Sequence, residues 1–190
     1  DRLFEHAKAF TCAGYLTLRG ASLVVLRMFK CFKNQQPFCF FDGHAHFHGF
    51  GAQAVAANLL ASPDGTCNSI PELIQALKDW HAKNGTDKTQ GWILGMGFDD
   101  AVLKENRFPT KEDLDQISKD IPICIVHISG HFAAMNSKGL EMSNITAASK
   151  NPSGGVIRRM PGSQEPNGVL EELAAIPLFF KLLAPTDPVL

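Results

Sequence analysis

The sequence predicts an α/β fold built around a parallel sheet, and three observations support this prediction. Apolar runs typical of buried strands lie at residues 38–43, 92–96 and 121–128. The last run is apolar without alternation, as expected for a strand that is covered on both faces. Helical patterns separate the runs, so the chain reads as a βαβαβ series, in which the strands pair in parallel.

The helices between these strands have recognisable ends. Ser69 and Glu72 form a capping-box pattern that opens a helix, and the Asn84-Gly85 pair ends it. Thr110, followed by Asp113 three residues on, opens a second helix in the same way. We therefore expect helices on both sides of the 92–96 strand in the chain.

The second half of the chain also shows recognisable helix and strand patterns. Residues 132–140 read as a helix after the third strand. Residues 155–159 and 168–170 flank a polar segment and predict a β-hairpin. The apolar segment 173–183 predicts a final helix.

Composition limits the classes of protein to be considered. With 190 residues and 45% apolar content, the chain can bury one sizeable core. Because 18 basic residues stand against 19 acidic ones, an electrostatic nucleic-acid partner is not expected. No apolar run is long enough to span a membrane. The five cysteines are widely spaced without a C-x-x-C pair, which favours a reducing compartment, and we expect a cytoplasmic protein.

The strongest functional pattern is F-C-F-F-D-G-H-A-H-F-H-G, an apolar run followed by alternating histidines. Since alternate residues of a strand share a face, His44 and His46 would present two imidazoles to one point at a strand end. Imidazole nitrogen is a preferred ligand of zinc and other divalent transition metals. The alternative is a polar surface loop that contains histidines by chance.

The other two predicted strands also end in polar residues. Asp99 and Asp100 follow the second strand, and Ser129 and His131 follow the third. Active sites of parallel α/β folds gather at the carboxyl ends of the strands, so these residues are site candidates. Asp99-Asp100 equally fits a helix-capping pair. His127, inside an apolar run, is interpreted as a core histidine.

Four segments, in this order, carry a family resemblance beyond D-G-H-A-H: W-I-L-G-M-G-F-D-D, P-T-K-E-D-L-D, S-G-H-F-A-A-M-N-S-K-G-L and G-G-V-I-R-R…P-N-G-V-L-E-E. Together they resemble the YtcJ-like branch of the metal-dependent amidohydrolases. This branch, amidohydrolase family 3, includes the N-substituted formamide deformylases. The resemblance covers about residues 37–185.

The resemblance implies a (β/α)₈ barrel of the metal-dependent hydrolase type, of which this chain would hold about three parallel strands plus a hairpin. It implies hydrolysis of a non-peptide carbon–nitrogen bond in a small-molecule amide, with one or two divalent metal ions. Zinc is the expected ion, with manganese or iron as alternatives. The metal ligands fall on His44 and His46, with Glu172 as a further candidate. His131 falls where the substrate or the site wall would be contacted. Asp99, from its position after a predicted strand, is a further candidate for substrate binding.

Two departures from the family keep other functions open. Residues 1–36 do not resemble the usual start of family members, so the predicted organisation is an atypical segment 1–36 and a barrel part 37–190. The family's catalytic aspartate would lie beyond the C-terminus, so we expect a truncated chain. The chain could then be a catalytically silent isoform or pseudoenzyme. A PHP- or TatD-like phosphoesterase is a weaker alternative, because no basic residue lies near the histidines.

Overall fold

The computed structural model of the chain describes residues 54–183. Its elements belong to one compact unit that begins at Val55. The predicted strand 38–43, the domain boundary after residue 36, and both His44 and His46 lie outside the described residues. Within residues 54–183, no helix is long and apolar enough to cross a membrane.

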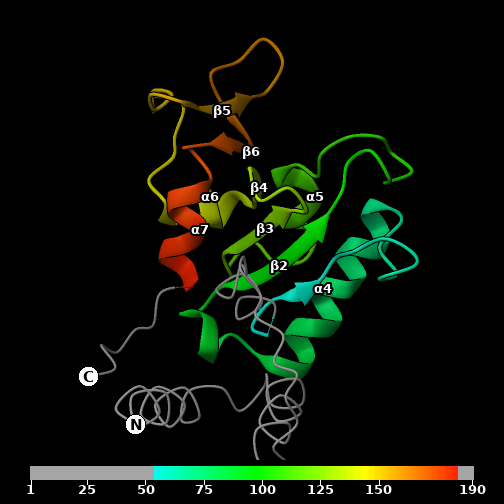
Figure 1. The fold of residues 1–190 in the computed structure, drawn as a ribbon. Coiled ribbons are helices and arrows are strands. Elements are labelled where there is room, and N and C mark those ends of the chain that lie inside the picture. The colour runs from blue at the N-terminus through cyan, green and yellow to red at the C-terminus, as the bar shows by residue number, and fades with distance from the viewer. Residues whose placement is uncertain (1–53, 184–190) are drawn as a thin grey trace, which may run out of the picture. The chain divides into compact units, whose positions relative to one another are not determined.

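Six strands form one mixed sheet (Figure 1). They are β1 (Ala57–Asn58), β2 (Ile93–Phe98), β3 (Ile123–His127), β4 (Phe132–Met135), β5 (Gly155–Arg159) and β6 (Pro166–Glu172), in the spatial order β1-β2-β3-β4-β6-β5. The pairs β1–β2 and β2–β3 are parallel, whereas β3–β4, β4–β6 and β5–β6 are antiparallel. The α/β class and the hairpin are confirmed, but the sheet is mixed. The partial barrel stays a prediction.

Between the strands of the described region lie α4 (Ile70–Asn84), a short 3₁₀ helix (η1, Asp87–Thr89), α5 (Lys111–Asp115) and α6 (Ser137–Met142), and α7 (Ile176–Leu183) follows β6. The predicted caps are present. Ser69 Oγ accepts the Glu72 N–H at the start of α4, and Gly85 ends that helix with a φ of 63°. At α5, the Asp113 carboxylate accepts the Thr110 N–H at 2.7 Å, as a capping box requires.

The core lies on both faces of the sheet, because successive side chains of β3 belong to different apolar clusters. Ile123 and Ile125 join one apolar cluster with Leu73 and Leu77 of α4. Cys124 and Val126 join a second cluster, against which α6 and α7 pack. Figure 1 shows α4 on one side of β2 and β3, and α6 and α7 on the other. This explains why the third strand is apolar without alternation.

The expected helix over residues 132–140 is wrong in its first half. Phe132–Met135 is strand β4, which pairs with β3 on one side and with β6 on the other. Its Ala-Ala-Met stretch is buried, so tertiary pairing overrides the local helical preference of alanine. The helix begins only at Ser137, where Asn136 Oδ1 caps it by accepting the Gly139 N–H.

Asn136 is also the polar centre of this part of the core. Its side chain is fully buried and makes four hydrogen bonds. Oδ1 accepts the N–H groups of Ile123 and Gly139, and Nδ2 donates to the carbonyls of Ser118 and Ile121. Every donor and acceptor site of the amide is therefore occupied, and the start of β3 is fixed against the end of β4.

Candidate functional site

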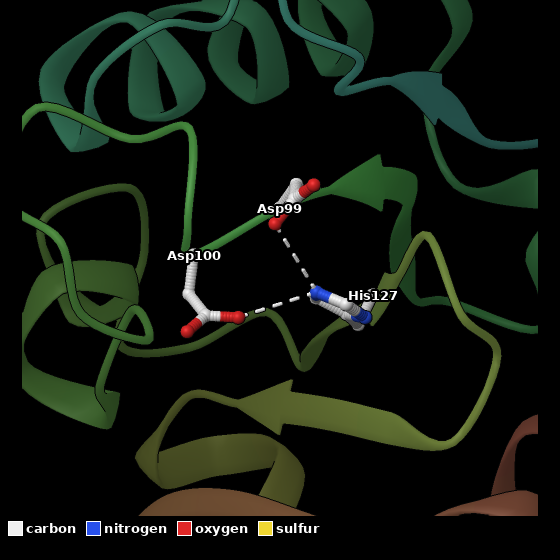
Figure 2. A group of neighbouring side chains, drawn as sticks. All are labelled: Asp99, Asp100 and His127. Carbon is white, nitrogen blue, oxygen red and sulfur yellow. Dashed lines mark ion pairs between the residues drawn. The ribbon is translucent and has the colours of Figure 1, made fainter.

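Three polar side chains meet where the parallel strands β2 and β3 end (Figure 2). Asp99 and Asp100 directly follow β2, and His127 is the last residue of β3. Nε2 of His127 lies 3.2 Å from Oδ1 of Asp100 and 3.7 Å from Oδ1 of Asp99. One ligand atom from each residue lies within 4.8 Å of the others. We call these three residues the Asp-Asp-His cluster.

A glycine at the end of β2 brings the two aspartates to this place. The register between β2 and β3 shifts between Met96 and Phe98, around Gly97 with a φ of +98°. A Cβ at Gly97 would lie 2.8 Å from the Leu60 side chain, so only glycine fits without rearrangement. The Phe98 carbonyl then accepts the Ile128 N–H, which closes the two strand ends against each other.

Asp99 fills the capping role that its sequence position left open and also lies beside His127. Its Oδ1 accepts the Ala101 N–H at 3.0 Å, and its carbonyl accepts the N–H groups of Val102 and Leu103. This is the turn-capping role. The same carboxylate is about one-third exposed and faces the His127 ring, so it also contributes to the cluster.

His127 is held in one orientation by its surroundings. The rings of Phe98, Phe108 and Phe132 pack around it with centroids 5.3–5.8 Å away. Its Nδ1 accepts the Ser129 N–H at 3.1 Å and lies 2.8 Å from Ser129 Oγ. The core interpretation of this histidine is half right, because the ring is buried, but its Nε2 faces two carboxylates.

A second pair lies on the segments that follow. His131, between β3 and β4, places Nδ1 2.8 Å from Oε2 of Glu172, the last residue of β6. About half of each side chain is exposed. Glu172 has a φ of +49°, a conformation that costs about 1–2 kcal/mol for a residue other than glycine. Such strain is typical of functional positions.

The predicted site residues thus fall into two groups. Asp99 lies beside His127, whereas His131 lies beside Glu172. The sequence interpretation missed the part played by His127 and left Asp100 open. The position of His127 at the last residue of a parallel strand, level with Asp99-Asp100 on the neighbouring strand, was the signal that could have found it.

An aromatic wall and one cation flank the cluster. Phe108 and Phe132 pack against each other with ring centroids 5.3 Å apart, and both are partly buried. The Arg158 guanidinium lies 4.4 Å from the Phe108 centroid, a cation–π contact. Arg158 is also hydrogen-bonded to the Glu171 carboxylate.

The donor chemistry of this edge fits a divalent metal. Two carboxylates and one imidazole are ligands that zinc, manganese and iron accept. The Glu172 carboxylate is a further oxygen donor, although its Oε2 is already engaged by His131. The residues described here therefore suit the ion that the sequence predicts.

Comparison with known proteins agrees with this chemistry. The sequence model of the amidohydrolase family, Amidohydro_3, matches residues 39–189. The chain belongs to the amidohydrolase family. The resemblance drawn from the sequence motifs is confirmed, and the match extends over β1 to β6 of the described sheet.

Three curated relatives are similar to the chain. Protein LONG AFTER FAR-RED 3 of Arabidopsis thaliana is 30% identical over 135 residues, covering 70% of this chain and 21% of that protein. Putative amidohydrolase YtcJ of Bacillus subtilis (strain 168) is 29% identical, covering 71% of this chain and 24% of that protein. N-substituted formamide deformylase of Arthrobacter pascens is 29% identical, covering 72% and 24%. The chain spans about a quarter of these relatives or less.

Two solved structures are also similar to this amidohydrolase chain. Each is described as an uncharacterized metal-dependent hydrolase. The one from Pyrococcus horikoshii OT3 is 28% identical with a TM-score of 0.49, and the alignment covers 76% of this chain and 24% of that one. The one from Pyrococcus furiosus is 26% identical with a TM-score of 0.48, covering 80% and 25%.

Proposed function

We propose that this chain is part of a metal-dependent hydrolase that cleaves carbon–nitrogen bonds other than peptide bonds, with a small amide or N-substituted formamide as substrate. The observation that carries the proposal is the family match over residues 39–189. A relative named N-substituted formamide deformylase supports the substrate class. The polar side chains at the carboxyl ends of β2 and β3 support the location, because parallel α/β folds form active sites at that edge.

In this proposal His44 and His46 hold the metal, with Glu172 as a further candidate ligand. Imidazole nitrogen and carboxylate oxygen are the usual ligands of catalytic zinc, and manganese or iron takes the same donors. A bound divalent metal lowers the pKa of a coordinated water toward neutrality and polarises the carbonyl of the amide.

His131 and Asp99 are the proposed substrate-contacting residues. His131 orients the Glu172 carboxylate through its 2.8 Å contact, and Nε2 of the neutral ring can then accept a hydrogen bond from a substrate N–H. The partly buried rings of Phe108 and Phe132 lie beside His127, whose register partner Phe98 directly precedes Asp99. Such an apolar surface suits a substrate whose nitrogen carries an apolar substituent.

The test is amine release by the 190-residue chain. The purified chain is stripped with a chelator, reloaded with zinc or manganese, and incubated with an N-substituted formamide, an N-acetyl amine and an aryl phosphate. We expect amine release from at least one amide that the chelator abolishes and the metal restores. Release of phosphate without release of amine would instead assign a phosphoesterase, and no turnover of any substrate would favour the catalytically silent chain over an active one.

Two variants connect the activity to the predicted ligands. Replacing His44 and His46 by alanine should abolish amine release, because both proposed ligands are lost. His48→Ala is the matched control, since this histidine lies in the same motif but outside the proposed ligand set. Equal loss of activity in both variants would contradict the ligand assignment.

A further inference from the structure

We propose that the Asp-Asp-His cluster is itself a divalent-metal site, which binds through one carboxylate oxygen each from Asp99 and Asp100 and through Nε2 of His127. Its three ligands are different residues from the ligands proposed at His44 and His46. It does not depend on the proposed hydrolase activity.

The distances from His127 Nε2 to the two carboxylates fit one shared ion. For bonds of about 2.0–2.2 Å, neighbouring ligand atoms around zinc lie about 3.0–3.6 Å apart. The two Nε2–Oδ1 separations of 3.2 and 3.7 Å are close to this range. Side chains on two adjacent strand ends supply the atoms, so the backbone already holds them together (Figure 2).

The orientation of His127 is a second, independent observation. Its side chain is only 11% exposed, and its Nε2 is buried with no hydrogen-bond partner. The Asp100 oxygen is near enough for an ion pair, yet the ring nitrogen is not aligned with it for a hydrogen bond. A buried polar atom without a hydrogen bond is uncommon. An Nε2 that lies between two carboxylates and is aligned with neither is the arrangement expected of a metal ligand.

The other ring nitrogen has the partner that a metal-bound histidine needs. When a metal occupies Nε2, the proton of the neutral ring is on Nδ1, which must donate to an acceptor. Ser129 Oγ lies 2.8 Å away and can accept that proton. In the metal-free state the Ser129 N–H donates to Nδ1, so the proton is then on Nε2. Metal binding therefore moves the ring proton from one nitrogen to the other.

The two acidic side chains of the cluster also favour binding of a cation. Asp99 and Asp100 bring two negative charges, and the ion pairs described for both go to the same imidazole. The neighbouring Arg158 is engaged by Glu171. Two carboxyl groups against one imidazole suit a divalent cation.

The decisive experiment is a calorimetric titration of zinc into the 190-residue chain in which His44 and His46 are both alanine. We expect one equivalent of zinc to bind to this variant. Adding Asp99→Asn and Asp100→Asn should weaken that binding by at least about tenfold, since changes even to groups around a metal ligand cost that much. Asp79→Asn, an exposed aspartate on α4, is the matched control and should leave the isotherm unchanged.

The tautomer of His127 gives a readout that does not depend on stoichiometry. In ¹⁵N NMR of the ring, zinc should convert Nδ1 from an unprotonated to a protonated nitrogen. Asparagine matches aspartate in size, and thermal unfolding of each variant confirms that the fold is kept. No zinc binding once His44 and His46 are removed, or equal binding by the aspartate and asparagine forms, would overturn the proposal. Zinc binding by the unaltered 190-residue chain without amine release would count against the hydrolase proposal instead and leave this site standing.

Discussion

His131 and Glu172 are joined twice, once through their side chains and once through the backbone. Nδ1 of His131 lies 2.8 Å from Oε2 of Glu172, and the Glu172 N–H donates to the His131 carbonyl at 2.7 Å. The double contact ties the turn before β4 to the end of β6. It holds Glu172 in its left-handed conformation and fixes the direction of its carboxylate.

Replacing either member of this pair should affect activity far more than stability. Because both side chains are about half exposed, His131→Gln or Glu172→Gln should change the free energy of unfolding by less than about 1 kcal/mol. If the pair orients a metal ligand, kcat/KM for the amide should fall by about 10- to 100-fold. Urea unfolding and amine release measure the two effects.

Glu141→Gln is the control for this prediction. It removes another exposed ion pair, Lys138–Glu141, on α6. Stability should change as little as in the first two variants, while kcat/KM should stay at the wild-type value. A comparable loss of activity in Glu141→Gln would show that the effect of the His131–Glu172 pair is not specific.

Asn136→Ala should be strongly destabilising. The substitution leaves two buried N–H groups and two carbonyls without their amide partner, which should cost at least about 2 kcal/mol. Asn136→Asp should be similarly harmful, because a carboxylate oxygen would then face the carbonyls of Ser118 and Ile121. The exposed Asn84, which donates to the Trp80 carbonyl, is the matched control. Equal midpoints for Asn136→Ala and Asn84→Ala in urea would refute this account.

Asp113 supports the α5 start and the segment before it. Its carboxylate accepts the Thr110 N–H and both Arg107 guanidinium N–H groups, at 2.6–3.0 Å. We expect Asp113→Ala to destabilise the fold by about 1–2 kcal/mol through loss of the cap. Glu112→Ala, one residue earlier and exposed, should cost less than about 0.5 kcal/mol. The measurement is chemical denaturation followed by circular dichroism.

The same residue predicts part of the acid sensitivity of the fold. Burial acts to raise the pKa of Asp113, but hydrogen bonds from Arg107 and Thr110 outweigh it and hold the pKa below its usual value. A carboxyl whose pKa is lower in the folded state stabilises the protein above its unfolded pKa of about 3.9. That contribution is lost as the pH falls through the lower folded value. The stability difference between wild type and Asp113→Asn should therefore shrink between about pH 5 and pH 2. A difference that stays constant over that range would show that Asp113 makes no such contribution.

Sequence signals over a few residues predicted the helix ends and the hairpin, because interactions between near neighbours determine them. The Ser69–Glu72 cap, the Gly85 end and the 155–172 hairpin are present because capping hydrogen bonds and turn residues act over a few positions. Strand β4 was not predictable in this way. Its short Phe-Ala-Ala-Met run has no strand pattern of its own, and only pairing with β3 and β6 makes it a strand.

The residues of the candidate site were likewise predictable only in part. Asp99 and His131 were predicted from their positions just after strands, and the structure places both at strand ends. His127 was assigned to the core because its neighbours in the sequence are apolar. The parallel register of β2 and β3, which sets it beside Asp99 and Asp100, becomes visible only in three dimensions.

The central claim is that a divalent metal bound by this chain's own histidines serves the hydrolysis. The most direct test is an anomalous difference map, recorded at the zinc edge, from crystals of the metal-loaded 190-residue chain. The proposed function predicts a peak bonded to the imidazoles of His44 and His46. Fully zinc-loaded crystals in which those two imidazoles are ordered and carry no peak would contradict it.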